Sequence, residues 1–223
     1  MKNEVLKRIL SSLTIIPISF FFIIKGSVFF LFFLAIFFLA TSYEWVKMNK
    51  NNIVKLIGVI FLLSSSYSAY LLREGTSNDL NIFLFVMIIC IFTDIGGYIF
   101  GKLFKGPKLT KISPNKTYSG MIGSFILSVV AAKLFIENSF VLTSHITIFE
   151  FGFFMSNDFN LLLVILFISS ISQIGDLVVS YFKRLSKVKN TGNLIPGHGG
   201  LLDRVDGIIF AIPISYILFR ILT

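Results

Sequence analysis

Charged residues are scarce in this chain of 223 residues, since Asp, Glu, Lys and Arg make up only 14% of it. A soluble globular domain carries about 25%, so this scarcity excludes a disordered chain, a nucleic-acid-binding arm and most soluble enzymes. Cysteine is scarcer still. The single Cys90 lies in an apolar run, which supports neither a disulfide framework nor a thiolate metal site.

Apolar sequence takes the place of the missing charge. Hydrophobic residues make up 55% of the chain, including 27 Phe, and the mean hydropathy is +0.87. These values predict a polytopic membrane protein. The 20 Lys and Arg exceed the 11 Asp and Glu, giving a net charge of +9. In a membrane protein this excess indicates cytoplasmic loops that face anionic lipid, and it also suits a substrate that carries phosphate.

The apolar runs predict an all-α fold of about seven transmembrane helices, with six to nine compatible, because about 20 residues cross a hydrocarbon core. The predicted spans are Ile9–Ile24, Gly26–Tyr43, Ile53–Leu72, Leu80–Gly101, Thr117–Ile136, Phe159–Phe182 and Asp206 to the C-terminus. The run 140–155 is broken by polar residues and is interpreted as an interfacial loop, with an extra hairpin as the alternative. We divide the chain into N-terminal helices (1–80) and a region that carries the chemistry (81–223), because polar residues bunch from Asp94 onward.

Basic residues gather in the N-terminal segment and in alternate loops. They are Lys2, Lys7 and Arg8; Lys47, Lys50 and Lys55; Lys102, Lys105, Lys108, Lys111 and Lys116; and Lys183, Arg184, Lys187, Lys189 and Arg204. The positive-inside rule therefore predicts that the N-terminus and both central basic loops face the cytoplasm.

Four carboxylates are predicted to meet at the cytoplasmic side of the bundle: Asp94, Asp176, Asp203 and Asp206. Ionisable groups at membrane depth are costly and usually face a partner or a water-filled cavity. A single Asp could equally be a charge at a helix end, but four from three spans at one depth favour a site. Carboxylates without His or Cys suit a hard divalent cation, most naturally Mg²⁺ bound together with substrate phosphates.

Two basic loops beside these carboxylates favour a phosphate ligand. One contains Lys111, Ser113, Pro114, Asn115, Lys116 and Thr117, and the other contains Lys183, Arg184, Lys187 and Lys189 before Gly192, Gly197, His198, Gly199 and Gly200. Glycines let backbone N–H groups approach an anion, and the following helix adds a favourable dipole. Ser113 and Thr117 could instead cap the next helix.

Three other polar features have simpler interpretations. Gly97 and Gly101 form a G-x-x-x-G pair that indicates helix packing. The neighbours Tyr43, Glu44 and Trp45 are interpreted as an anchor at the membrane edge. His145 is interpreted as interfacial.

A longer pattern extends over the second of these loops. The segment Ser180-Tyr-Phe-Lys183-Arg184, then Lys189-Asn190, then Pro196-Gly-His-Gly-Gly-Leu-Leu-Asp203-Arg204-Val-Asp206 resembles the signature of phosphatidate cytidylyltransferases, or CDP-diacylglycerol synthases. Three more segments agree with that family, namely Asp94-Ile-Gly-Gly-Tyr-Ile-Phe-Gly-Lys102, Ser113-Pro-Asn-Lys-Thr117 and Gln173-Ile-Gly-Asp-Leu177. The resemblance covers roughly residues 90 to 210.

The resemblance implies a nucleotidyltransferase of phospholipid biosynthesis that converts CTP and phosphatidic acid to CDP-diacylglycerol and pyrophosphate. It would lie in the cell (inner) membrane with its active site facing the cytoplasm, bind Mg²⁺, with K⁺ as a second ion, and bind no nucleic acid. The oligomeric state stays open, a homodimer included. Asp176 and Asp203 would hold the metal. The catalytic set would be Asp176, Asp203, Lys183, Arg184, Lys189 and Arg204. Substrates would contact Asp94, Ser113, Asn115, Lys116, Thr117, His198, Gly199, Gly200 and Asp206.

Two positions depart from the family's pattern. Asn190 stands where the family has Asp, and Asn115 stands where it has Lys. Each change removes one charge from a polar loop. It is therefore expected to affect the detailed contacts of the site and the reaction rate more than the class of reaction.

Two other functions stay open. One is a CTP-dependent enzyme that acts on another lipid phosphate or on a polyprenol. The other is a small cation transporter, which predicts polar residues spread over the depth of the bilayer. Here they gather at one side, so the transporter is the weaker alternative.

Overall fold

The computed structural model describes residues 2–75, 79–142, 158–195, 197 and 199–222. Helices account for nearly all of this part, which contains no strand and only two isolated β-bridges. In chain order the elements are α1 (Lys2–Lys25), α2 (Ser27–Met48), α3 (Asn52–Glu74), α4 (Asp79–Phe104), α5 (Tyr118–Leu142), α7 (Asp158–Leu185), the 3₁₀ turn η1 (Leu202–Arg204) and α8 (Ile208–Leu222). The predicted all-α class is confirmed.

Five of these helices, α2, α3, α4, α5 and α7, are long and apolar enough to cross a membrane. The apolar parts of α1 (Ser11–Lys25) and α8 (Ile208–Ile221) are shorter. The chain is therefore an all-helical membrane protein, and the count of seven spans stays a prediction. The run interpreted as an interfacial loop falls mostly within residues 143–157, which with His145 lie outside the described part.

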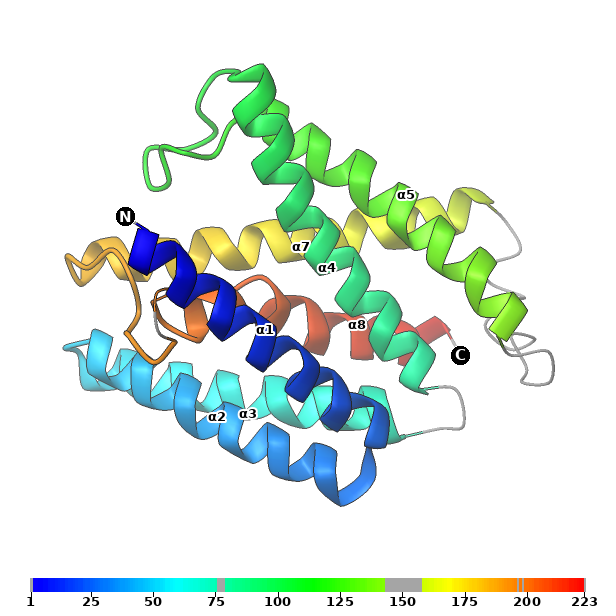
Figure 1. The fold of residues 1–223 in the computed structure, drawn as a ribbon, viewed down its shortest axis with the longest axis horizontal. Helices are drawn as coiled ribbons and strands as arrows, with labels where there is room; N and C mark the ends of the chain where they lie inside the picture. Colours follow the sequence, from blue (N-terminus) through cyan, green and yellow to red (C-terminus); the bar gives the residue numbers. More distant parts are fainter. Residues whose placement is uncertain (1, 76–78, 143–157, 196, 198, 223) are drawn as a thin grey trace.

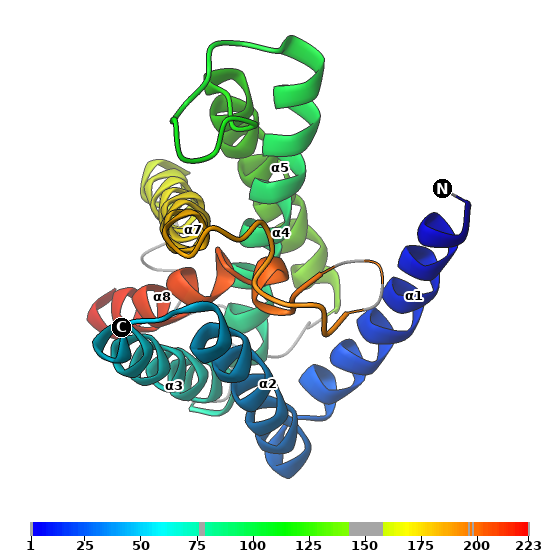
Figure 2. The same ribbon diagram turned by 90° about the vertical axis from the view of Figure 1, so that its left-hand side faces the viewer.

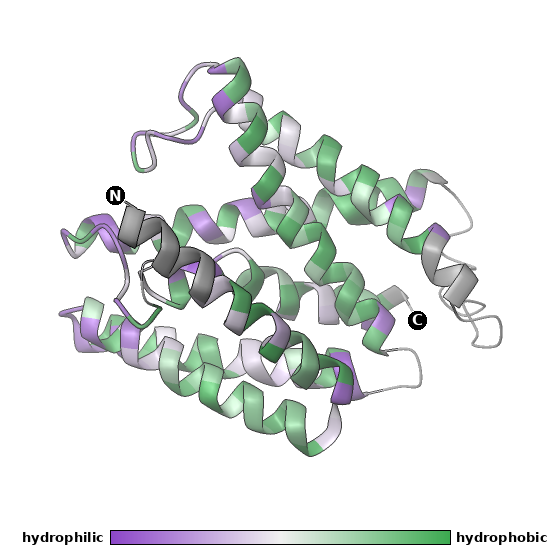
Figure 3. Cartoon of the chain, in the orientation of Figure 1, coloured by the Kyte–Doolittle hydropathy of each residue, from purple (hydrophilic) through white to green (hydrophobic). Residues whose placement is uncertain are grey.

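The basic segments gather at one end of the bundle. The N-terminus, the α2–α3 connection, the loop between α4 and α5 and the loop after α7 all lie at the left in Figure 1. Figure 3 shows hydrophilic residues concentrated in these loops and apolar residues along the helices between them. The alternation on which the predicted orientation depends is thus present in the fold.

Glycines allow α4 and α5 to pack closely. A Cβ on Gly96 would lie 2.5 Å from the carbonyl oxygen of Gly123, and one on Gly120 would lie 2.7 Å from that of Gly97. Gly101 also faces Gly120. Small residues at a helix interface let two backbones approach in a membrane, so the packing role predicted for Gly97 and Gly101 is confirmed.

Hydroxyl groups tie α4 to its other neighbours beside the predicted site. The Thr93 hydroxyl lies 2.8 Å from that of Ser169 on α7, and the Ser124 hydroxyl on α5 donates to the Thr93 carbonyl oxygen at 2.7 Å. These interhelical bonds fix the position of Asp94, the next residue on α4.

The end of α2 is buried, contrary to its interpretation as a membrane-edge anchor. Glu44 and Trp45 are 1% and 8% exposed, and only Tyr43 is exposed. The Trp45 indole donates to the Val54 carbonyl oxygen at 3.0 Å and meets the Phe182 ring edge to face. The interpretation was wrong for Glu44 and Trp45 because this turn of α2 faces the interior of the bundle, where it supports α7.

Candidate active site

Lys183 lies between two carboxylates. It belongs to the last turn of α7, and its Nζ atom is 2.8 Å from Asp203 Oδ1 and 3.8 Å from Asp206 Oδ2. Asp203 belongs to η1, and Asp206 follows it just before α8. All three side chains are only about one-tenth exposed. One ammonium group therefore joins α7 to the turn that opens α8, as the predicted clustering requires.

The second oxygen of Asp203 organises the glycine-containing loop before it. Asp203 Oδ2 accepts a hydrogen bond from the backbone N–H of Thr191 at 2.8 Å and from that of Gly200 at 3.2 Å. Gly199 has φ +92°, in the left-handed region that favours glycine. Both oxygens of Asp203 are thus engaged within the protein, and the N–H of Gly200 is directed at this carboxylate.

A second ion pair connects the α4–α5 loop to α7. Lys116 Nζ lies 2.6 Å from Asp176 Oδ2, and the hydroxyl of Ser180 donates to Asp176 Oδ1 at 3.2 Å. Lys116 also reaches the carbonyl oxygen of Gln173 at 3.4 Å. Thr117 accepts the N–H of Gly120 at 3.1 Å, so it does cap α5, the alternative role considered for it.

These residues line a small polar cavity of about 240 Å³. Its lining combines α4, the α4–α5 loop, α5 and α7, and it includes Asp94, Asn115, Lys116, Thr117 and Asp176. The structure therefore brings Asp94 and Asp176 to one space, together with three of the loop residues predicted to bind substrate. An open space lined by a lysine and carboxylates can take up phosphate groups through the lysine and a divalent cation through the carboxylates.

Asp206 connects the two ion pairs. Burial and, second, the nearby carboxylate of Asp176 raise the pKa of Asp206 well above its usual range, and Lys183 offsets only part of this. Two adjoining carboxyl groups repel when both are ionised, and a cation placed between them relieves that repulsion. The four predicted carboxylates thus form one continuous cluster.

The carboxylates of the site could supply one or two ligands to Mg²⁺, but not a complete set. Among the residues that the structure describes, no three His, Cys, Asp or Glu residues are close enough to hold a metal by themselves. Mg²⁺ commonly uses one or two carboxylates and keeps waters or substrate phosphates for its other positions. Both oxygens of Asp203 and both oxygens of Asp176 already have partners within the protein, so the metal-ligand roles predicted for these two residues stay predictions.

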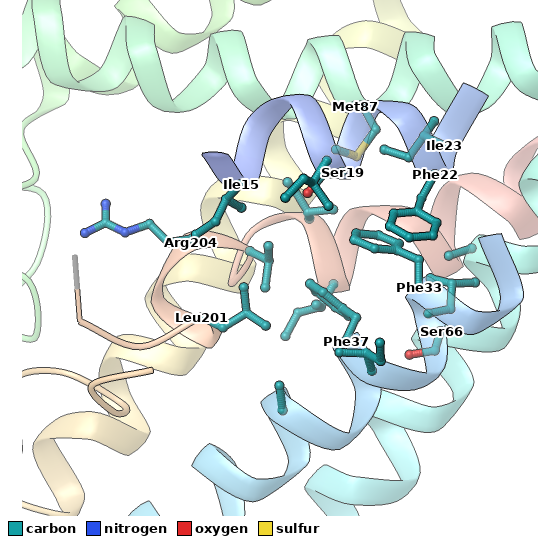
Figure 4. A pocket seen from close by; sticks show the side chains of 18 of the residues that line it. Ile15, Ser19, Phe22, Ile23, Phe33, Phe37, Ser66, Met87, Leu201 and Arg204 are labelled. Carbon is teal, nitrogen blue, oxygen red and sulfur yellow. The ribbon is translucent and has the colours of Figure 1, made fainter. Parts of the chain in front are cut away.

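An apolar cavity of about 710 Å³ lies beside η1. It is bounded by α1, α2, α3, α4 and α8 and by the loop residues Leu194, Ile195 and Leu201. Figure 2 shows α1 standing apart from the other helices. In Figure 4, Arg204 lies at one end of the cavity and Phe22, Phe33 and Phe37 line the rest. The consecutive residues Asp203 and Arg204 thus face a polar cluster and an apolar cavity, respectively.

The remaining predicted residues lie around this site. Arg184 is exposed and donates to the carbonyl oxygens of Ile112 and Val188 at 3.4 and 3.3 Å, which ties the two basic loops together. Lys189 is exposed, and Ser113 accepts the N–H of Lys116 at 3.0 Å. His198 lies outside the described residues. The phosphate contacts predicted for these residues stay predictions.

Glu44 contacts the site loop, although the sequence pattern did not indicate this. Its carboxylate, on α2, accepts three hydrogen bonds from the loop and turn between α7 and α8. An acidic residue at the end of an apolar span is unusual. That feature could have indicated that Glu44, unlike its neighbour Tyr43, has partners within the protein.

Comparison with known proteins gives consistent matches. The sequence model of the cytidylyltransferase family matches residues 51–222. A phosphatidate cytidylyltransferase of Rickettsia felis is 33% identical over 220 residues, covering 96% of this chain and 92% of the relative. Phosphatidate cytidylyltransferases of Rickettsia bellii and Staphylococcus haemolyticus are each 36% identical and cover 78% of this chain, with 72% and 64% of their own lengths matched.

Proposed function

The chain belongs to the cytidylyltransferase family, and we propose that it transfers CMP from CTP to phosphatidic acid, forming CDP-diacylglycerol and pyrophosphate. One structural observation carries this proposal beyond the resemblance. Arg204 of η1 lines the apolar cavity, and its neighbour Asp203 pairs with the buried Lys183 on α7, the same helix whose Asp176 lines the polar cavity. A lipid phosphate and a nucleotide must meet at such a junction if they are to react.

The polar cavity is proposed as the site of the triphosphate. Lys116 would contact phosphate oxygens, and Asp94 and Asp176 would face the same space. Asp176 would hold Mg²⁺ together with Asp203 or Asp206, which share Lys183, and the ion when bound would neutralise charge on triphosphate oxygens. Asn115 leaves this cavity with one positive charge fewer than the family's usual Lys would give it, so Lys116 carries more of the electrostatic attraction.

The apolar cavity is proposed to hold acyl chains of the lipid. Its lining is almost wholly apolar, and the guanidinium group of Arg204 stands at one end. Arginine binds phosphate through a planar set of N–H donors. A lipid with its chains among Phe22, Phe33 and Phe37 would therefore present its phosphate at η1, beside the polar cluster.

The transfer itself needs no covalent intermediate with the protein. A phosphate oxygen of phosphatidic acid attacks the α-phosphorus of CTP, the bond from that phosphorus to the bridging oxygen of the β-phosphate breaks, and pyrophosphate leaves with the electron pair. Catalysis of phosphoryl transfer depends mainly on positioning and charge stabilisation. Lys183 and Arg204 would neutralise the negative charge that gathers in the transfer, and the ion pair with Asp203 holds Lys183 in place.

The orientation in the membrane is also part of the proposal. The basic loops that form the site lie at one end of the bundle with the N-terminus (Figure 1). The positive-inside rule places that end in the cytoplasm, where CTP is available. The predicted homodimer and K⁺ stay predictions.

The position of the transferred label tests the reaction. Purified protein would receive CTP labelled at either the α- or the γ-phosphate, with phosphatidic acid or a polyprenol as acceptor and Mg²⁺ present. We expect the α-label, and not the γ-label, to enter lipid, with phosphatidic acid as the acceptor. Transfer of the γ-label to polyprenol would identify a lipid kinase, and no transfer of either label to any lipid would overturn the proposal.

A further inference from the structure

Glu44 joins the N-terminal helices to the loop that carries the site. Its Oε2 atom accepts hydrogen bonds from the hydroxyl of Thr191 at 3.0 Å and the N–H of Leu202 at 2.9 Å. Its Oε1 atom accepts the N–H of Leu201 at 3.0 Å. These bonds cross about 150 positions of the chain, from α2 to the loop and turn that precede α8.

The carboxylate is held by hydrogen bonds and not by an opposite charge. Glu44 is 1% exposed, and no residue in the described part of the chain forms an ion pair with it. A buried carboxylate is costly unless its oxygens are satisfied, and donors to an ionised oxygen give bonds of roughly twice the usual strength. The three donors are therefore fixed tightly by the charge that they surround.

Two glycines let the loop approach this carboxylate. A Cβ on Gly192 would lie 2.5 Å from Glu44 Oε1, and a Cβ on Gly200 would lie 2.7 Å from Glu44 Oε2. The loop could not keep these hydrogen bonds with larger residues at either position unless the backbone shifted. The glycines of this segment thus make room for a protein carboxylate, a second use besides the approach of a phosphate.

Thr191 is held from two sides. Its hydroxyl donates to Glu44, while its backbone N–H donates to Asp203 Oδ2 at 2.8 Å. Asp203 in turn contacts Lys183. A continuous set of hydrogen bonds and one ion pair therefore runs from α2 through Thr191 and Asp203 to α7, and Leu202, the residue before Asp203, is fixed to Glu44 as well.

We infer that Glu44 is a positioning residue for the transfer reaction, which holds η1 so that Asp203 faces Lys183 and Arg204 faces the apolar cavity. The expected effect on catalysis rests on the proposed function. The effect on the placement of the loop does not, and it can be measured separately. It also assigns the N-terminal helices a part in the site, although every residue of the family signature lies beyond residue 90.

The test combines hydrogen exchange with kinetics on Glu44→Gln. Glutamine keeps the size but offers one acceptor oxygen, so its NH₂ group must face at least one N–H donor of the loop. We expect faster amide exchange in 191–202 with unchanged exchange in α4 and α5, and a fall in kcat of about 10-fold or more. Glu74→Gln is the matched control, because Glu74 also accepts a backbone N–H, from Ser27 at 2.6 Å, away from the site. It should leave both readouts of the site unchanged.

A milder variant keeps the inference testable if Glu44→Gln fails to fold. Thr191→Val removes only the hydroxyl donor to Glu44 and keeps the N–H that Asp203 accepts. It should show the same faster exchange at a smaller loss of kcat, and Thr191→Ser should restore wild-type values. Wild-type exchange and kcat in both Glu44→Gln and Thr191→Val would overturn the inference, as would a loss of kcat without any change in exchange at 191–202. An inactive wild type with the expected exchange changes would instead count against the proposed function alone.

Discussion

Lys183 and Asp203 form an ion pair of 2.8 Å across the junction of α7 and η1, with both side chains about one-tenth exposed. Asp206 adds a second carboxylate 3.8 Å from the same ammonium group. Removing one partner of a buried pair leaves an uncompensated charge and costs far more than an exposed pair contributes. The pair therefore makes the turn before α8 sensitive to single substitutions in a way that the exposed lysines of the loops are not.

Asp203→Asn should abolish turnover and also destabilise the protein. An amide has one acceptor oxygen, so either Lys183 or the N–H groups of Thr191 and Gly200 lose their partner. We expect activity to fall by at least about 100-fold and the free energy of unfolding to fall by about 1–3 kcal/mol. Transfer assays and thermal unfolding in detergent measure the two effects, and a variant with wild-type activity would remove Asp203 from the site.

Arg204→Ala should weaken the use of lipid more than the use of nucleotide. Arg204 lines one end of the apolar cavity and does not line the polar cavity. We expect KM for phosphatidic acid to rise by about 10-fold and KM for CTP to change by less than about threefold, in line with the loss of one charged hydrogen bond. Arg220→Ala, at the last turn of α8, is the control and should change neither. A larger effect on CTP would place Arg204 with the nucleotide.

Asn190→Asp, which restores the residue usual in the family, should raise the rate or leave it within about twofold. Asn190 is exposed, and its amide lies beside Gly199, where a Cβ would be 3.3 Å away. Asp203 and Lys183 are organised without it. Asn190→Ala should lower the rate only modestly. If the native protein were inactive and Asn190→Asp active, this chain would be a degraded or repurposed member of its family.

Single cysteines test the orientation. With Cys90 replaced by Ser, Lys187→Cys should react with a membrane-impermeant reagent only from the cytoplasmic face, and Gly75→Cys only from the outside. Both positions are exposed, and they lie in the loop after α7 and at the end of α3, at opposite ends of the bundle. Labelling of both from one face would contradict the seven-span topology. Ser144, the outer position that the sequence suggests for such labelling, lies outside the described residues.

Much of this architecture could be predicted from the sequence because a membrane imposes strong local rules. Each of the seven predicted spans lies mostly on one helix, since apolar runs bounded by charge have few alternatives in lipid. The bunching of Asp94, Asp176 and Asp206 followed from the same rule, because carboxylates at one membrane depth must share partners. The helix-packing role of Gly97 was predictable from its spacing to Gly101.

Long-range hydrogen bonds could not be predicted in this way. Glu44 looked like one member of a membrane-edge trio, because nothing near it in the sequence indicates that Thr191 and Leu202 will be its partners. The pairing of Lys116 with Asp176 and of Lys183 with Asp203 likewise depends on how α7 lies against both loops. The apolar cavity could not be predicted either. Its lining comes from five helices, and in the sequence their apolar residues cannot be told from lipid-facing ones.

The dependence of pyrophosphate release on Mg²⁺ tests the central claim most directly. Rates would be measured with CTP and phosphatidic acid over a range of Mg²⁺ concentrations, and after chelation, for wild type, Asp176→Asn and the control Glu137→Gln on α5, whose side chain is exposed away from the site. We predict no release after chelation, saturable release by wild type and Glu137→Gln, and a fall of at least about 100-fold in Asp176→Asn with a higher Mg²⁺ requirement. Wild-type release by Asp176→Asn at limiting Mg²⁺ would contradict the claim that this carboxylate cluster is the centre of transfer.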